Sequence, residues 1–234
     1  PAAARPVAAS VVVIHGDQSL ASDGDRRFAL ALARHAVRWF REGGLDVDLC
    51  SDKDLSRDLR DRRVAMLIHC ADVKPGPLRE LQNFVRRGGT LIVCYSSSPG
   101  LADLMGVKLG VYARMEPGRL AGMHFERDKP VNTPVQIAQS SSNIIPVTPV
   151  AGRSSVLAWW VDRAGRRSGL AAWLQSDAGF WMSHTLSADG DAAAKGRLLV
   201  ALAAHKHPEL WQTAARDRLE RAGRVGPWTR PSDG

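Results

Sequence analysis

The sequence lacks any apolar run of the length needed to cross a membrane. A membrane-spanning helix takes about 20 consecutive apolar residues. Residues 1–10, PAAARPVAAS, are small and also lack the apolar core of a secretion signal. We therefore predict a soluble domain with no membrane partner.

Cysteine is scarce, and its spacing excludes two common stabilising devices. Cys50, Cys70 and Cys94 lie at or near the ends of predicted strands, with no CxxC pair and no paired histidine ligands. A small disulfide framework and a structural zinc site both need closer and more regular groups of such residues. We predict neither, and we predict no cofactor and no bound metal.

A lysine-rich block is also missing, although the chain is basic overall. Lysine and arginine number 32 against 24 acidic residues, which gives a net charge of +8. Most of this charge is arginine mixed with aspartate, as in LSRDLRDRR, with few aromatic residues interleaved. Nucleic-acid binding normally shows as a basic patch or stripe. The scattered pattern therefore argues against a nucleic-acid partner.

The clearest organised stretch is residues 63–106, which predict one strand–helix–strand unit. Residues 64–69 and 90–95 are continuous apolar runs of strand length, typical of strands covered on both faces. Gly88 and Gly89 end the helix between them, because glycine enters the left-handed region at little cost. The apolar face of that helix repeats every three or four residues: Leu78, Leu81, Phe84 and Val85. A crossover of this length makes the two strands parallel neighbours.

The residues before this unit repeat the same alternation of strand and helix. Residues 11–14 are a short apolar strand, and residues 25–42 have the apolar period of a helix. Residues 45–50 alternate as a second strand, and residues 55–62 form a short polar helix. This order predicts the α/β class, with a doubly wound and mostly parallel sheet.

After Gly106 the residue composition of the chain changes. Residues 107–153 are rich in Gly, Pro, Ser and Asn without a helical period, and they predict an irregular insertion with strand-like pieces at residues 109–113 and 135–138. Residues 156–186 contain the turns DRAGRRSG and QSDAG and predict an antiparallel β meander. We assign residues 1–207 to one α/β domain. Residues 208–234 are a C-terminal helix and linker, expected to lead to a further domain in the natural protein.

With these elements in place, the chain resembles a known fold. The segment LRELQNFVRRGGTLIV, residues 78–93, is similar to the flavodoxin-like fold of class I glutamine amidotransferase-like proteins. The similarity is greatest to the β-galactosidase trimerisation domains and the ThuA-like group. Residues 156–205, which include WLQSDAGFWMSHTLSADGD, resemble the amidotransferase-like domain that precedes the barrel of bacterial family 10-like glycosyl hydrolases.

The resemblance assigns two residues to catalytic positions. An active class I amidotransferase holds its cysteine on a sharp strand-to-helix turn, as GxCxG, and activates it with a histidine and a glutamate, often as HPE. Cys94 and His184 stand at the cysteine and histidine positions. Ile92 and Ser96 replace the two glycines, and no glutamate follows His184. The resemblance therefore implies a fold without glutaminase chemistry.

We predict a non-catalytic accessory or interaction domain of a larger bacterial glycoside hydrolase-like protein. Its partners are then other domains of the same polypeptide, and such a parent protein suggests a secreted or periplasmic location. A homo-oligomer stays open, because trimerisation does not transfer on fold alone. The alternative is a cysteine-dependent hydrolase or amidotransferase that uses Cys94 and His184. Two ordinary roles argue against this alternative: Cys94 can be a buried strand cysteine, and His184 can be a hydrogen-bonded histidine at the sheet edge.

A second alternative is a small-ligand or carbohydrate-binding module at the ends of the strands. Loops at the carboxyl ends of parallel strands are where open α/β sheets bind ligands. The predicted strand ends bring five polar residues to that edge: His15, Asp17, His69, Asp72 and Ser96. We expect some tryptophans of the meander to pack in the core and exposed ones to contact a neighbouring domain or a sugar: Trp159, Trp160, Trp173 and Trp181.

Overall fold

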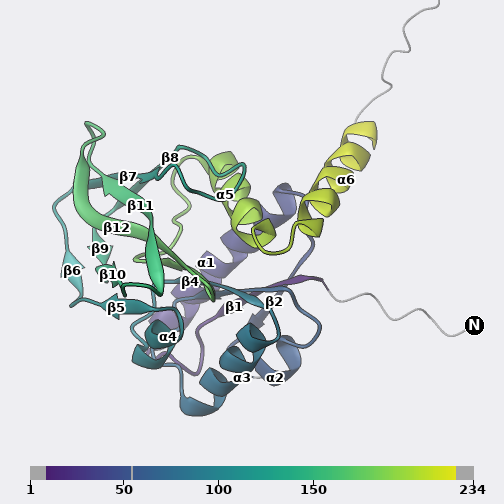
Figure 1. Ribbon diagram of the computed structural model, residues 1–234, viewed down its shortest axis with the longest axis horizontal. Helices are drawn as coiled ribbons and strands as arrows, with labels where there is room; N and C mark the ends of the chain where they lie inside the picture. The colour runs from purple at the N-terminus through teal and green to yellow at the C-terminus, as the bar shows by residue number, and fades with distance from the viewer. Residues whose placement is uncertain (1–8, 54, 225–234) are drawn as a thin grey trace, which may run out of the picture.

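The computed structural model describes residues 9–53 and 55–224, in which the largest sheet has nine strands (Figure 1). The strand order is β2-β1-β3-β4-β13-β12-β11-β7-β8. The first five strands of this order run parallel to one another. They are β2 (Val47–Ser51), β1 (Val11–His15), β3 (Val64–Ile68), β4 (Thr90–Cys94) and β13 (Gly179–Met182). The predicted mixed α/β class with a large, mostly parallel sheet is confirmed.

The parallel strands separate two hydrophobic cores. In β1, Val11 and Val13 belong to the core on one face, whereas Val12 and Ile14 belong to the core on the other. Strands β3 and β4 are buried over their whole length. Burial on both faces explains why these strands read as continuous apolar runs.

Helices cover both faces of the parallel strands. One core includes residues of α1 (Asp23–Glu42), α5 (Ala192–Ala204) and α6 (Glu209–Arg224). The other includes residues of α3 (Pro75–Arg86) and α4 (Pro99–Leu104), and it reaches α2 (Leu55–Asp58). Figure 1 shows α5 and α6 above the sheet and α2, α3 and α4 below it. No helix in the described ranges is long and apolar enough to span a membrane.

Helix α1 begins after the carboxyl end of β1 and ends before the amino end of β2, so it runs antiparallel to the parallel strands. Ser22 caps its start, because the serine hydroxyl accepts a hydrogen bond from the Asp25 amide at 3.0 Å. Gly43 and Gly44 end it, and Gly44 has a left-handed φ of 90°. A Cβ atom on Gly44 would lie 2.6 Å from the carbonyl oxygen of Ala214. Glycine is therefore required where α6 approaches the end of α1.

The remaining strands of the large sheet are antiparallel. Strands β11 (Ser154–Val161) and β12 (Arg167–Ser176) pair with each other, and β12 pairs with β13. This arrangement is the antiparallel meander that the sequence predicted. Because β13 also pairs with β4 in parallel, the meander continues the sheet directly from its parallel half.

Residues 107–153 contain more strand than the two strand-like pieces that the sequence predicted for this insertion. They contain β5 (Val107–Leu109), β6 (Ala113–Arg114), β7 (Leu120–Phe125), β8 (Gln136–Ser141), β9 (Asn143–Ile144) and β10 (Val147–Pro149). Strands β7 and β8 extend the large sheet beyond β11. Strand β8 alternates between exposed and buried residues, but Gln139 and Ser141 are among the buried ones. These polar residues explain why the sequence predicts a strand-like piece only as far as residue 138.

Candidate ligand site at the carboxyl ends of the strands

Four ring-bearing side chains line up where the parallel strands end. His69 follows β3, Tyr95 follows β4 and His184 follows β13, and these strands are adjacent in the sheet. The ring centroids of His69 and Tyr95 are 5.2 Å apart, and those of Tyr95 and His184 are 5.4 Å apart. Phe28 of α1 lies edge-on to His69 at 5.9 Å, and its side chain is 51% exposed. We call Phe28, His69, Tyr95 and His184 the aromatic crest.

Two residues of the aromatic crest have a strained backbone. His69 has φ of 54° and Tyr95 has φ of 57°, in the left-handed region that residues with a Cβ atom seldom adopt. The His69 amide donates to the Cys94 carbonyl at 2.9 Å, and the Tyr95 amide donates to the Met182 carbonyl at 3.2 Å. These bonds continue the sheet by one residue past the strand ends and hold the strained turns in place.

Tyr95 occupies the sharp turn that the resemblance assigned to Cys94. Cys94 is the last residue of β4, and its side chain lies in the core that includes Ile92 and Met182, where it is 1% exposed. Burial raises the pKa of the Cys94 thiol above its ordinary value. Because β4 is buried over its whole length, the first partly exposed residue is Tyr95, which lies past the end of the strand. The position expected for a nucleophile therefore carries a tyrosine ring.

The ring of His184 is held by a hydrogen bond to the backbone of the next residue. Its Nδ1–H donates to the Thr185 carbonyl at 2.9 Å, which fixes the tautomer of the neutral ring. Burial lowers the pKa of His184. The carboxylate of Asp189 accepts from the Ser140 amide at 2.8 Å and lies 3.4 Å from the Lys195 ammonium. In the described part of the chain no hydrogen bond joins Cys94 to His184.

His69 has a polar atom with no partner. Its Nδ1 atom is buried and makes no hydrogen bond to any described residue. Burial also lowers the pKa of His69, so the imidazole is neutral at pH 7. An unsatisfied buried polar atom costs about 1–3 kcal/mol. Because this nitrogen is closed to solvent, a ligand would reach it only if the rings packed around it moved aside.

The other predicted site residues serve the loops around the aromatic crest. The His15 Nδ1–H donates to the carbonyl of the next residue at 3.1 Å. Asp17 lies 2.7 Å from the Lys53 ammonium, and the hydrogen bond from Lys53 lowers the pKa of Asp17. Asp72 pairs with Lys74. Ser96 is buried and donates to the carbonyl of Cys70 at 2.6 Å. Of the residues proposed for catalysis or binding, only His69 and His184 belong to the aromatic crest.

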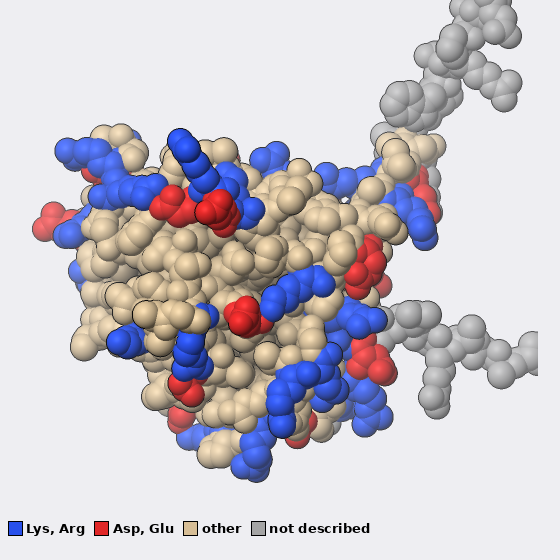
Figure 2. All heavy atoms as spheres, viewed as in Figure 1, with Lys and Arg blue, Asp and Glu red and all other residues tan. Residues whose placement is uncertain are grey.

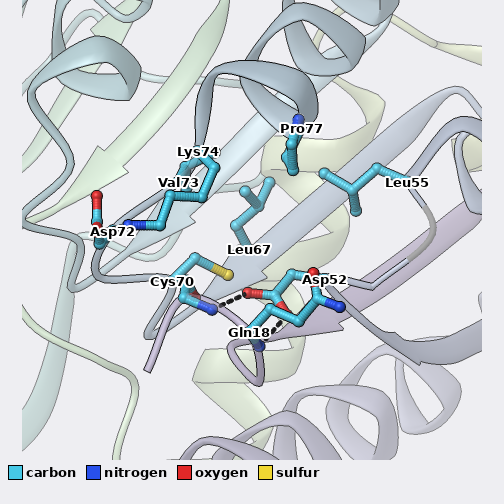
Figure 3. Close-up of a pocket in the computed structure, with 10 residues that line it drawn as sticks. Gln18, Asp52, Leu55, Leu67, Cys70, Asp72, Val73, Lys74 and Pro77 are labelled. Atoms are coloured by element: carbon cyan, nitrogen blue, oxygen red, sulfur yellow. Dashed lines mark hydrogen bonds and ion pairs between the residues drawn. The ribbon is translucent and has the colours of Figure 1, made fainter. Parts of the chain in front are cut away.

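The first loop of the sheet contains an anion site that the chain fills itself. Three consecutive amides, of Asp17, Gln18 and Ser19, donate to the Asp52 carboxylate at 3.0, 2.8 and 3.0 Å. Figure 3 shows this carboxylate beside Gln18, with the Cys70 sulfur nearby. Backbone amides in such a turn normally bind a phosphate or another anion. Nothing in the sequence around Asp52 distinguishes it from an ordinary turn residue.

A small cavity lies next to the Asp52 carboxylate. Its volume is about 20 Å³, enough for roughly one water molecule. Asp52, Cys70 and the buried Ser19 line it, and the Ser19 hydroxyl has no hydrogen-bond partner among the described residues. The cavity is far below the size of a ligand pocket. Within residues 9–53 and 55–224 no cluster of three or more His, Cys, Asp or Glu could hold a metal ion.

The tryptophans of the meander divide between core and surface. Trp160, Trp173 and Trp181 are buried. Trp159 is partly buried, and its indole N–H donates to Glu126 at 2.7 Å. On the face shown in Figure 2, basic and acidic side chains are interspersed, and the middle of that face is largely uncharged.

Comparison with known proteins identifies the fold but no family. No family model matches the chain, and no curated protein matches it. Among solved structures, a protein of Bacteroides uniformis described as ThuA-like matches with a TM-score of 0.60 at 13% identity. That match covers 86% of this chain and 93% of the other.

Two glycoside hydrolases also contain this fold. A β-galactosidase of the haloarchaeon Halorubrum lacusprofundi matches with a TM-score of 0.61 at 17% identity, over 84% of this chain and 30% of that one. Gan42B, a GH42 β-galactosidase of G. stearothermophilus, matches with a TM-score of 0.55 at 15% identity, over 77% and 28%. This chain therefore spans less than a third of either enzyme. The predicted resemblance to these groups is confirmed for the fold alone.

Proposed function

We propose that this chain is a non-catalytic accessory or interaction domain of a larger glycoside hydrolase-like protein. The observation that carries the proposal is the turn after β4, where Tyr95 stands at the nucleophile position and Cys94 is buried below it. The share of the two β-galactosidases that this fold covers supports a role beside a separate catalytic domain.

Thiol catalysis at this edge would need three things that the geometry does not supply. A nucleophile must be open to substrate, must lie within hydrogen-bond reach of its base, and works as the thiolate. Cys94 is 1% exposed, and burial disfavours its thiolate. The Nδ1 atom of His184 is directed at a backbone carbonyl. These features favour an accessory role over the hydrolase or amidotransferase alternative.

Iodoacetamide alkylation tests the proposal. The experiment uses a Cys50→Ser background, because Cys50 is partly exposed, although burial together with Asp58 raises its pKa to about 12. We expect Cys94 to react only after the protein is unfolded, from neutral pH up to about pH 9. Fast labelling of the folded protein, with an apparent thiol pKa well below about 8.5 and lost in His184→Ala, would establish an activated thiolate. Cys94→Ser identifies the labelled site.

A second candidate function is the binding of a small neutral ligand, such as a sugar, at the aromatic crest. The unpartnered Nδ1 of His69 favours it; because this atom is buried, binding requires the Phe28 or Tyr95 ring, which both pack against His69, to move aside. Aromatic rings with one polar handle suit a ligand that has an apolar face and hydroxyl groups. Titration with monosaccharides, followed by the ¹⁵N resonances of His69, should shift Nδ1 first. Equal shifts in Phe28→Ala would argue against a site there.

A further inference from the structure

A ligand-sized groove lies between α5 and α6, away from the aromatic crest. Its volume is about 320 Å³, within the usual range for small-molecule pockets of about 300–1,000 Å³. It adjoins Gly43, which follows the last turn of α1. Gly43 therefore lies near the amino ends of the parallel strands, whereas the aromatic crest lies past their carboxyl ends. Its walls come from three helices and the β7–β8 loop: Gly43, Asn132, Arg197, Val200, Trp211, Ala214, Ala215 and Arg218.

The hollow follows from small residues on one face of α6. Trp211, Ala214, Ala215 and Arg218 have the spacing of residues that share a helix face. The two alanines leave space below the partly exposed ring of Trp211. Opposite them, Gly43 packs so tightly that a Cβ atom would lie 2.6 Å from Val200. The floor of the groove is therefore apolar and closely packed, with an indole as one wall.

Two unpaired arginines line this apolar floor. Arg197 of α5 and Arg218 of α6 are exposed, and neither makes an ion pair or hydrogen bond to a residue that the structure describes. Elsewhere on α6, Arg221 lies 2.7 Å from Asp217. The planar guanidinium group binds a carboxylate through two parallel hydrogen bonds. The groove thus combines an apolar surface with two positive charges that have no acidic partner among the described residues.

We propose that the α5–α6 groove binds an organic carboxylate with an apolar body. The carboxylate would pair with Arg197 and Arg218, and the apolar body would lie against Trp211. Inorganic phosphate would leave the apolar floor uncovered, and a neutral sugar would leave both guanidinium groups unpaired. The assignment is independent of the accessory role, because it uses no residue of the aromatic crest.

Calorimetric titration with 3-phenylpropionate tests the proposal, with 3-phenylpropan-1-ol as the neutral analogue and inorganic phosphate as the purely anionic one. The variants are Arg197→Gln and Arg218→Gln. Arg216→Gln is the matched control, because Arg216 is an exposed arginine of the same helix that does not line the groove. The Trp211 indole N–H resonance, assigned by its loss in Trp211→Phe, reports where the ligand sits.

We expect the carboxylate to bind at least about tenfold more tightly than the alcohol and phosphate, since a hydrogen bond to a charged group is worth that much. Each groove variant should weaken binding by at least about tenfold, and Arg216→Gln should leave it unchanged. Equal binding of alcohol and carboxylate would overturn the proposal, as would equal losses in Arg216→Gln and Arg218→Gln. Binding of an acidic peptide without any binding of 3-phenylpropionate would assign the groove to a protein partner instead.

Discussion

The loops on either side of the aromatic crest differ from the crest in how their polar atoms are paired. On one side the Asp52 carboxylate accepts three backbone amides. On the other side the buried Lys195 ammonium donates to the carbonyls of Ser187, Asp189 and Gly190. The crest between them keeps the His69 Nδ1 without a partner and two residues in the left-handed region. Charged side chains of the chain itself thus satisfy the backbone groups of the flanking loops, whereas no charged side chain pairs with the His69 Nδ1 in the described part of the crest.

The largest loss of stability should come from Lys195→Met. The lysine side chain is fully buried, and its removal leaves several carbonyls of the loop after β13 unsatisfied. At about 1–3 kcal/mol for each unsatisfied buried group, we expect a loss of roughly 3–5 kcal/mol in the free energy of unfolding. Urea unfolding measures it.

Lys206→Met is the matched control for this substitution. Lys206 also donates to a backbone carbonyl, that of Asp177, but it is exposed. We expect a change of less than about 0.5 kcal/mol, as for most surface substitutions. Similar losses in the two variants would mean that the buried ammonium does not hold the loop.

Asp52→Ala should cost roughly 3 kcal/mol, because three amides lose a charged acceptor. Asp52→Asn should lose less, since its amide oxygen still accepts. Formate at about 0.1 M, compared with chloride at equal ionic strength, should raise the melting temperature of Asp52→Ala and leave the wild type unchanged. If formate and chloride have the same effect on Asp52→Ala, the loop is not an anion site.

Asp52 and Lys195 are examples of what the sequence alone did not predict. The parallel strands were predictable because burial on both faces gives continuous apolar runs. Strand β8 was predicted only as a strand-like piece at residues 135–138, because the next residue, Gln139, is polar; it is buried there, with its side chain donating to the Thr185 carbonyl at 2.9 Å. Asp52 and Lys195 make hydrogen bonds to backbone groups of loops that fold back onto them. No local sequence pattern marks such contacts.

The candidate site was predictable only in part. His69 and His184 follow apolar strands, so the resemblance and the strand ends predicted their place past the carboxyl ends of the strands, and their role in a site stays a prediction. The shift from Cys94 to Tyr95 depends on a left-handed backbone one residue past the ladder. Sequence offers no sign of it, because tyrosine is not a residue that favours that conformation.

Acid should destabilise the fold through its buried histidines. Burial lowers the pKa values of His69, His184 and His207 in the folded protein. The unfolded chain then binds protons first as the pH falls below about 6.5. Stability should therefore be highest above pH 6.5 and fall between that value and the lower folded pKa values. Urea midpoints measured from pH 8 to 5 check this, and a flatter profile is expected for His184→Asn.

The smallest effect concerns the strained turn at Tyr95. Tyr95→Gly removes the cost of the left-handed conformation, whereas Tyr95→Ala keeps it, and both lose the ring. We expect the glycine variant to be more stable than the alanine variant by about 1 kcal/mol. Equal stability of the two would mean that the turn relaxes once the ring is gone.

The titration of His184 tests the non-catalytic assignment most directly. The measurement is the ¹⁵N chemical shifts of its imidazole from pH 5 to 9, in the wild type and in Cys94→Ser. We predict a neutral ring with the proton on Nδ1 above pH 6.5, unchanged by Cys94→Ser. A charged imidazole that persists above pH 7 and becomes neutral in Cys94→Ser would reveal a thiolate–imidazolium pair and contradict the account.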